Sequence, residues 1–454
     1  MQRENKMGVM PVKKLVITMA LPIMISMLAQ AFYNVVDSIF VSKVCEDALT
    51  AVSLAFPAQN LMIGVATGTG VGVNALLSRS LGEKDFDKAN NIASHGIFLA
   101  IISSVVFLLF GFFGAPLFFK AQVGTDSPIY AYGVDYLSVV CICSIGLFGQ
   151  VAMERLMQAT GKTTLSMVTQ LTGAVINIIL DPLFILGIGP FPRLEAKGAA
   201  VATVVGQIIS FIIGIILHEK YNKEITLRFR SFVPDLKLIG NIYKIGVPSI
   251  LMLAIGSVMT FCLNKILLAF SSTAAAVFGV YFKLQSFIFM PVIGINNGVV
   301  PIVAYNYGAK NRKRILATVR FSCAMAVTIM AVGMVLMWVM PETMLRLFDA
   351  SEDMMSLGVP ALKIISTTFI MAGVSINLGS VFQALGKSYY SMIVSFARQI
   401  VVLLPAAYLL SKTGVLTNVW FAFVIAEFMS LAVTLICFGY VNKTIIKKIT
   451  PSGE

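Results

Sequence analysis

The sequence predicts an all-α polytopic membrane protein with twelve transmembrane helices in two six-helix bundles related by a pseudo-twofold axis. Three observations support this fold class. Hydrophobic residues make up 58% of the 454 positions and charged residues only 12%, whereas soluble domains carry about 25% charged residues. The apolar residues form long runs, and about 20 such residues in a helix span the roughly 30 Å hydrocarbon core of a bilayer. The two halves of the chain also repeat each other weakly.

The spans are defined by the apolar runs and by the Gly, Pro and charged residues that interrupt them. Uncharged runs at 97–113, 208–217 and 401–410 lie inside three of them. The twelve spans are predicted at 14–40, 50–76, 91–119, 129–158, 163–188, 197–218, 241–270, 274–304, 315–340, 357–385, 389–411 and 416–440.

The basic residues predict the orientation of these spans. The termini and the loops after even-numbered spans hold most of the Lys and Arg residues. The opposite loops hold only Lys43, Lys120, Arg193, Lys197, Arg346 and Lys412. Because short cytoplasmic loops are enriched in Lys and Arg, both termini are predicted to be cytoplasmic. This distribution also accounts for the net charge of +13 and argues against nucleic acid as a partner. The short basic N-terminus suits a bacterial cytoplasmic (inner) membrane.

An internal repeat with an offset near 226 residues supports two similar halves. Pro22 matches Pro248, and Gly72 matches Gly298. The segments 81–84 and 307–310 also match, as do 158–162 and 383–387. Six spans per half give both halves the same orientation, with a cavity between them. We therefore predict an N-lobe at 1–225 and a C-lobe at 226–454, joined by a cytoplasmic linker at about 219–238. Two parallel bundles favour a transporter that works by alternating access.

Polar and acidic residues within the first-half spans form the main candidate site. Ionisable groups deep in a membrane cost at least about 2.5–3.5 kcal/mol, so they need a function or a partner. On the first span the spacing i, i+3, i+4, i+7 gathers four polar residues on one helix face. The fifth and sixth spans add further polar residues, and Pro182 exposes a backbone carbonyl in the fifth. The residues are Gln30, Tyr33, Asn34 and Asp37, then Gln170, Asn177 and Asp181, then Thr203 and Gln207.

Asp37, Asn177, Asp181 and Thr203 can supply oxygen ligands for a cation such as Na⁺. The two acids can instead carry protons, because burial and like charge both favour the protonated form of a carboxylic acid. The alternative is a structural hydrogen-bond cluster that joins three helices.

Two other acids lie within predicted spans. Glu154 shares a helix face with Gln150 and precedes Arg155, so it is either a cation-attracting group or half of an interfacial ion pair. In the second half Glu427 is the one acid within spans that also contain Lys265, Lys283 and Arg398. Glu427 is therefore either part of a buried ion pair or a substrate carboxylate, and the role of the three cations stays open.

Several function classes are disfavoured. No nucleotide-binding or metal-binding motif occurs, and the two histidines, His95 and His218, are too few for a histidine-ligated metal or a catalytic cluster. We therefore expect neither an enzyme nor a cofactor. Transport without an ATP site must draw on an ion gradient.

Together these residues resemble the multidrug and toxic compound extrusion (MATE) family, over essentially the whole chain. The resemblance rests on Asp37, on the Leu81-Gly82 loop, and on the Gln-Ala-x-Gly-Lys turns after spans four and ten. It also rests on Asn177-x-x-x-Asp181-Pro182 and on the stretch 198–203. Among bacterial members the chain is most similar to the MepA-type drug exporters.

The resemblance implies a V of two lobes, H⁺- or Na⁺-coupled antiport, and export of amphipathic organic cations, giving drug resistance. It implies a coupling site at Asp37, Asn177, Asp181 and Thr203. The polar residues within the spans add candidates for the substrate cavity, namely Gln30, Tyr33, Asn34, Gln150, Glu154, Gln170, Gln207 and Glu427. Some relatives place an acidic cation site in the seventh span, but 261–265 of this chain contains no carboxylate. We expect membrane lipids as partners and a monomer. The alternative function is a flippase for lipid-linked saccharides or other anionic amphiphiles.

Overall fold

The protein is helical throughout the part of the chain that its structure, a computed structural model, describes: residues 5–42, 44, 46–188, 190–227, 232–348 and 350–449. Ten helices in this part are long and apolar enough to cross a membrane. Two further pairs pass the same test together, although they are bent by 44° and 49° at a short break, so the candidate spans number up to 12. The bent pairs are α6 (Pro128–Ile142) with α7 (Ile145–Ala159), and α14 (Glu352–Ser366) with α15 (Phe369–Ala384). The predicted fold class is therefore confirmed.

The helices pack into two compact units, which do not coincide with the halves of the sequence. Unit 1 comprises Met1–Met24 and Leu251–Glu454, and unit 2 comprises Ile25–Ile250. Two helices contribute to both units, because the boundaries fall inside α2 (Val12–Ser42) and α10 (Leu236–Leu268). The predicted lobes at 1–225 and 226–454 are divisions of the sequence and not of the packing, so they stay a prediction.

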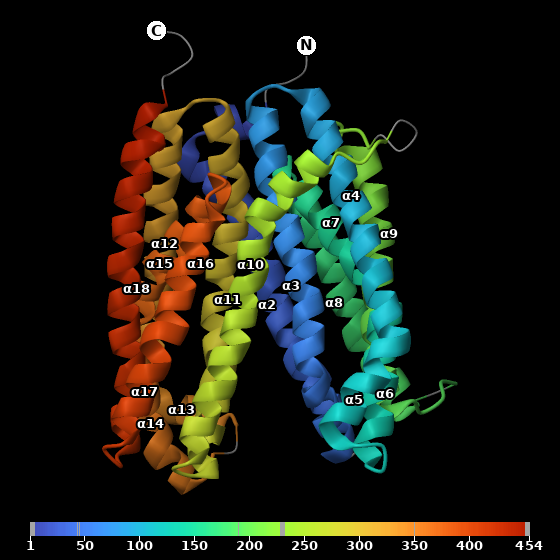
Figure 1. The fold of residues 1–454 in the computed structure, drawn as a ribbon, viewed down its shortest axis with the longest axis vertical. Coiled ribbons are helices and arrows are strands. Elements are labelled where there is room, and N and C mark those ends of the chain that lie inside the picture. The colour runs from blue at the N-terminus through green and yellow to red at the C-terminus, as the bar shows by residue number, and fades with distance from the viewer. Residues whose placement is uncertain are drawn as a thin grey trace. The chain divides into compact units, whose positions relative to one another are not determined.

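Unit 2 is a bundle in which α8 and α9 lie side by side and both contact α7 (Figure 1). Gly187, whose φ of 70° few other residues adopt, ends α8, and the chain then turns back into α9. Besides α6, α7 and the shared helices, the unit contains α3 (Glu46–Gly82), α4 (Phe86–Leu109), the π-helix η1 (Phe110–Gly114), α5 (Ala115–Val123), α8 (Thr163–Leu186) and α9 (Glu195–Tyr221).

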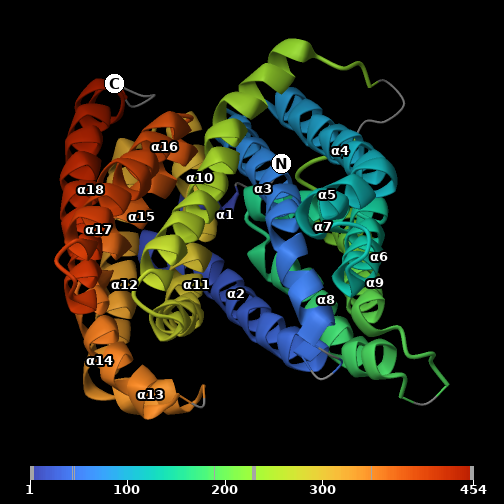
Figure 2. The ribbon, with the colours of Figure 1, turned by 60° about the horizontal axis from the view of Figure 1, so that its bottom comes forward.

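Unit 1 has its own apolar core, which includes Phe278, Phe369 and Trp420. Short helix α13 packs beside α14 at one end of this unit (Figure 2). Besides α14, α15 and the shared helices, the unit contains α1 (Lys6–Val9), α11 (Ser272–Gly308), α12 (Arg312–Val339), α13 (Pro341–Arg346), α16 (Ser388–Phe396), the π-helix η2 (Ala397–Leu403), α17 (Leu404–Ser411), α18 (Leu416–Thr444) and the 3₁₀-helix η3 (Ile446–Lys448).

The internal repeat extends to the backbone of one turn in each half. Lys84 and Lys310 both adopt positive φ, at 61° and 55°. The next residues, Asp85 and Asn311, each cap the following helix by accepting a hydrogen bond from the backbone NH three residues on, at 3.0 and 3.2 Å. A side-chain oxygen at this position satisfies a donor that the first helical turn leaves unpaired.

A pair of glycines spaced as Gly-x-x-x-Gly occurs in each unit and permits a close helix crossing. A Cβ on Gly294 would lie 2.7 Å from the backbone of Met24, and a Cβ on Gly298 would lie 3.0 Å from Cα of Ala20. In unit 2 a Cβ on Gly68 would lie 2.8 Å from the carbonyl oxygen of Gly246, and one on Gly72 would clash with the backbone of α10. Small residues at this spacing let helix backbones approach closely in membranes. The first parts of α2 and α10 are packed in this way.

The linker between α9 and α10 is fixed to the end of α4 within unit 2. The side-chain oxygen of Asn90 accepts a hydrogen bond from the backbone NH of Thr226 at 2.8 Å. Nε2 of His95 accepts one from the backbone NH of Asp235 at 2.9 Å. The ring of Phe232 lies 4.8 Å from that of His95. The linker predicted at about 219–238 is shortened to the segment between Tyr221 and Leu236, and residues 228–231 lie outside the described part.

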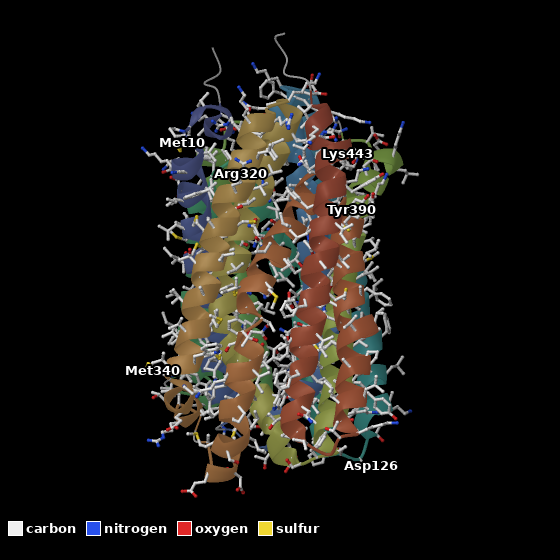
Figure 3. The ribbon with its side chains drawn as sticks, turned by 90° about the vertical axis from the view of Figure 1, so that its left-hand side faces the viewer. Met10, Asp126, Arg320, Met340, Tyr390 and Lys443 are labelled. Atoms are coloured by element: carbon white, nitrogen blue, oxygen red, sulfur yellow. The ribbon has the colours of Figure 1, made fainter. Side chains whose placement is uncertain are left out.

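The N-terminal helix α1 is held within unit 1 by Arg314 and by Asn306, whose Nδ2 donates to the carbonyl oxygen of Met7 at 3.1 Å. Nη2 of Arg314 donates to the carbonyl oxygens of Met7 and Met10 at 3.0 and 2.7 Å. Its Nε donates to Oδ1 of Asn306 at 3.1 Å. Figure 3 shows Met10 and Lys443 near one end of the unit and Met340 near the other. The first and last described helices of unit 1 therefore reach the same end of the unit. A chain that crosses the membrane an even number of times has both termini on the same side.

Candidate functional site

A polar cavity of about 130 Å³ lies within unit 2, between α2, α3, α7, α8 and α9. It exceeds the roughly 10–15 Å³ that one water molecule needs, so it can hold several waters or a small polar ligand. Eight of the residues predicted from the sequence line it: Gln30, Tyr33, Gln150, Glu154, Gln170, Asn177, Thr203 and Gln207. The helical spacing that suggested these residues therefore places them around one space.

Hydrogen bonds connect the side chains across this cavity. Nε2 of Gln170 on α8 donates to Oε1 of Gln30 on α2 at 3.2 Å. Nε2 of Gln150 donates to Oε1 of Glu154 one turn later on α7, at 2.9 Å. Most of the cavity's polar side chains are amides, which both donate and accept hydrogen bonds. The lining can therefore adapt to ligands with different polar groups.

The amide of Asn177 connects α8 to α9 at the edge of the cavity. In the orientation that satisfies both of its ends, its nitrogen donates to Oδ2 of Asp181 at 3.2 Å. Its oxygen then accepts the backbone NH and the hydroxyl of Thr203, both at 3.2 Å. Asp181 is fully buried and Asn177 nearly so. Asp181, Asn177 and Thr203 are thus connected by hydrogen bonds. Asn177 and Thr203 line the cavity, and Asp181 lies behind them.

Asp37 lies beside this chain and has an unsatisfied carboxylate oxygen. Its Oδ1 is buried without a hydrogen-bond partner among the described residues. Asp37 also lines a second, more open pocket of about 250 Å³ between α2 and α3. The carboxylates of Asp37 and Asp181 are close enough to interact electrostatically. An oxygen of this kind is an acceptor for a proton, a cation or a water molecule.

Five predicted site residues do not line the cavity: Asp37 and Asp181, which lie beside it, and three others. Asn34 is exposed on α2, and Pro182 lies within α8 without ending the helix. Glu427 belongs to unit 1, where Oε2 accepts a hydrogen bond from Nη1 of Arg398 at 3.1 Å. The sequence left an ion pair open as one interpretation of Glu427, and the structure has that pair.

The site also includes residues that the sequence did not single out. Gln59 and Thr67 of α3 line the cavity. Oε1 of Gln59 accepts a hydrogen bond from the hydroxyl of Tyr136 at 3.2 Å. Tyr136 is buried on α6. Gln59 and Tyr136 could have been identified from the sequence, because each is a polar residue inside an otherwise apolar span and buried polar groups require partners.

The oxygen-rich lining limits which cations the site can take. Among the described residues no cluster of three or more His, Cys, Asp or Glu side chains could hold a metal ion. Carboxylate, amide and hydroxyl oxygens are hard ligands, which suit small hard cations rather than soft transition metals. The cations that fit are therefore a transported proton or an ion such as Na⁺.

Ten to twelve apolar helices and a polar cavity buried within one bundle define a polytopic membrane transporter and not an enzyme. The model of the MatE family matches residues 22–183 and again residues 248–409, so its second match begins 226 residues after its first. The chain belongs to the MatE family, as the resemblance implied.

Two kinds of relative agree with this assignment. The multidrug export protein MepA of Staphylococcus haemolyticus (strain JCSC1435) is 27% identical over 413 residues, covering 90% of this chain and 89% of that protein. A multidrug resistance MATE family transporter of the MOP superfamily, solved in an outward-facing conformation, has a TM-score of 0.91 at 24% identity and covers 98% of this chain and 99% of its own. A MOP superfamily transporter from Pyrococcus furiosus Vc1, for which reverse polarity of the binding pocket suggests a different function, also has a TM-score of 0.91, at 23% identity and with the same coverage.

Proposed function

We propose that this transporter is a cation-coupled antiporter that exports amphipathic organic cations from the cytoplasm by alternating access, with H⁺ or Na⁺ as the coupling ion. The observation that carries the proposal is the pair of buried carboxylates, Asp37 and Asp181, beside the polar cavity in unit 2. Glu154 lines that cavity, and Asp181 reaches it through Asn177. Asp37 and Asp181 form no salt bridge among the described residues, and buried carboxylates of this kind favour positively charged ligands.

The coupling ion binds at Asp37, Asn177, Asp181 and Thr203 in this proposal. Two ionised carboxylates that face each other in a dry environment repel, and a proton or Na⁺ relieves that repulsion. The pocket on α2 and α3 that Asp37 lines offers a route for the ion to this group. Pro182 supports the proposal, because a proline within α8 weakens the helix next to Asp181.

The substrate binds from the cytoplasm and competes with the ion for the same negative charge. Tyr33 and the glutamines of the cavity supply an aromatic face and adaptable amides. A cavity of about 130 Å³ is smaller than the roughly 300 Å³ of a drug-sized pocket, so substrate binding requires this space to widen. We further propose that the protein is a monomer in the bacterial inner membrane, surrounded by lipid, with both termini in the cytoplasm.

The proposal is tested by ethidium accumulation in efflux-deficient bacteria that express the wild type, Asp181→Asn or Asp126→Asn at matched levels. Asp126 is exposed and far along the chain from the cavity residues, so it controls for loss of a carboxylate as such. We expect low accumulation with the wild type and with Asp126→Asn, and accumulation at the empty-vector level with Asp181→Asn. Repeating the assay in sodium-free buffer distinguishes Na⁺ from H⁺.

Two outcomes would contradict parts of the proposal. Full efflux by Asp181→Asn would remove this carboxylate from the coupling mechanism. No difference between wild type and empty vector would exclude ethidium as a substrate and favour the second candidate, a flippase for lipid-linked saccharides or other anionic amphiphiles. The observation that favours this second candidate is the excess of Lys265, Lys283 and Arg398 over Glu427 in the membrane helices of unit 1.

A further inference from the structure

The ion pair between Arg398 and Glu427 in unit 1 leaves hydrogen-bond donors of Arg398 and an acceptor oxygen of Glu427 unpaired among the described residues. Glu427 is 5% exposed, yet its Oε1 has no hydrogen-bond partner among the described residues. Arg398 makes one side-chain hydrogen bond in the described part of the chain, from Nη1 to Oε2 of Glu427 at 3.1 Å. A guanidinium has five N–H donors, so most of those of Arg398 remain available. A buried ion pair that only stabilises packing needs its remaining polar atoms satisfied.

The backbone around Arg398 departs from a regular α-helix. Arg398 lies in the π-helix η2, between α16 and α17, and these elements pack along α18, which carries Glu427 (Figure 1). π-Helical turns inside α-helices are rare and are frequently found at functional sites. The side chain of Arg398 remains 29% exposed, compared with 7% for that of Glu427. A ligand can therefore reach the guanidinium while the carboxylate stays buried.

Two other membrane-embedded cations of unit 1, Lys265 and Lys283, have no carboxylate partner among the described residues. Nζ of Lys265 lies 4.8 Å from the centre of the Phe261 ring, and Nζ of Lys283 lies 5.9 Å from that of Phe348. No salt bridge to either lysine occurs among the described residues. Unit 1 thus carries an excess of positive charge in its helices, whereas the cavity of unit 2 contains acids. The one acid among these cations, Glu427, uses a single oxygen on Arg398.

From this arrangement we propose that Arg398 is a binding site for the carboxylate or phosphate of an anionic ligand, and that Glu427 competes with the ligand for it. The planar guanidinium pairs with such groups through two parallel hydrogen bonds. Glu427 occupies only one donor, so an incoming oxyanion can take the others. Glu427 then acts as an internal competitor that lowers the affinity of the site. The site is separate from the polar cavity of unit 2 and does not depend on the export of cations.

The test is direct binding to the purified protein in lipid nanodiscs, measured by calorimetry with empty nanodiscs as the blank. Three probes with the same ring are compared: 2-naphthoate, neutral 2-naphthamide and 2-naphthylmethylammonium. We expect naphthoate to bind more tightly than the other two. Arg398→Gln should abolish this preference and Arg398→Lys should weaken it. Glu427→Gln should tighten naphthoate binding by about tenfold, as the removal of one competing charge-assisted hydrogen bond predicts.

The opposite effects of the two substitutions separate a binding site from a structural pair. Arg320→Gln removes an exposed cation from α12 of the same unit (Figure 3) and should leave binding unchanged. Equal weakening by Arg398→Gln and Glu427→Gln, with lower melting temperatures for both, would make the pair purely structural and overturn the proposal. Tighter binding of the ammonium probe than of naphthoate would also overturn it, because Glu427 would then be the ligand group. Each result is independent of whether ethidium is exported.

Discussion

At the scale of single residues, the backbone NH and the hydroxyl of Thr203 together hold the amide of Asn177 in one orientation. The hydroxyl and the backbone NH of Thr203 both donate to the amide oxygen of Asn177, which leaves the amide nitrogen to face Asp181. An amide held at both ends presents a fixed donor to the carboxylate. The geometry of the proposed coupling site therefore depends on a side chain that carries no charge.

Replacing Thr203 with Val removes this hydroxyl at nearly constant volume. We expect a loss of about 0.5–1.5 kcal/mol of ion-binding free energy, the usual net contribution of one hydrogen bond, and a shift in the pH or Na⁺ dependence of efflux. Transport in inverted membrane vesicles across a range of ion concentrations measures this shift. Thr203→Ser keeps the hydroxyl and should behave as the wild type. A shift with Thr203→Ser but none with Thr203→Val would show that the γ-methyl group matters rather than the hydrogen bond.

Most residues of the candidate cavity could be predicted from their spacing in the sequence. The side-chain contacts between different helices could not. Gln30 and Tyr33 are polar residues three apart in an apolar helix, so a shared face follows from helix geometry. The same rule wrongly grouped Asn34 with them around the cavity, because a helix face of four residues is wider than the space it borders. Gln59 and Arg398 could not be assigned partners, since these come from helices distant in the sequence.

At the scale of elements, the glycine pairs allow helices from different parts of the chain to cross closely. In unit 1, Gly294 and Gly298 of α11 face Met24 and Ala20 of α2. Even the Cβ of Ala at Gly298 would lie 3.0 Å from Cα of Ala20, so any larger side chain must push these backbones apart. The crossing is therefore a sensitive point of the unit 1 packing.

Substituting Leu for Gly298 should destabilise the protein by about 1–3 kcal/mol or more, as overpacking of a close contact does. A lower melting temperature and a lower yield of monodisperse protein in detergent would show this. Gly279→Leu is the matched control, because Gly279 lies on the same helix and a Cβ there meets nothing within 4 Å. If both variants were equally stable, the close approach of α2 and α11 would not contribute to stability.

The positions of the helices were predictable to within a few residues, whereas their interruptions were not. An apolar run reports the length of a span but not its straightness. The breaks between α6 and α7 and between α14 and α15 therefore left no mark on the hydrophobic pattern. Ser144 and Thr368 at these breaks are compatible with a continuous helix. The π-helix at Ala397–Leu403 is also invisible in the pattern, since its residues are apolar apart from Arg398 and Gln399.

At the scale of the whole molecule, the charge distribution predicts which side of the membrane each loop faces. A fluorescent protein fused after residue 449 should fold and fluoresce, because it stays in the cytoplasm. Alkaline phosphatase inserted near Asp126, in the loop between α5 and α6, should be active, because this enzyme folds only outside the cytoplasm. The reverse fusions at the two sites are the controls. Phosphatase activity at the C-terminus would reverse the predicted orientation.

Each of the two units contains helical segments from both halves of the sequence, so the two halves depend on each other to fold. Each unit is completed by a helical segment from the other half of the sequence: Val12–Met24 joins the unit of the second half, and Leu236–Ile250 joins that of the first. This reciprocal exchange is the arrangement of a domain-swapped dimer, here fused into one polypeptide. Neither half of the sequence therefore contains all the helical segments of one unit. Two fragments made by cutting the linker should accordingly fold only when they are produced together.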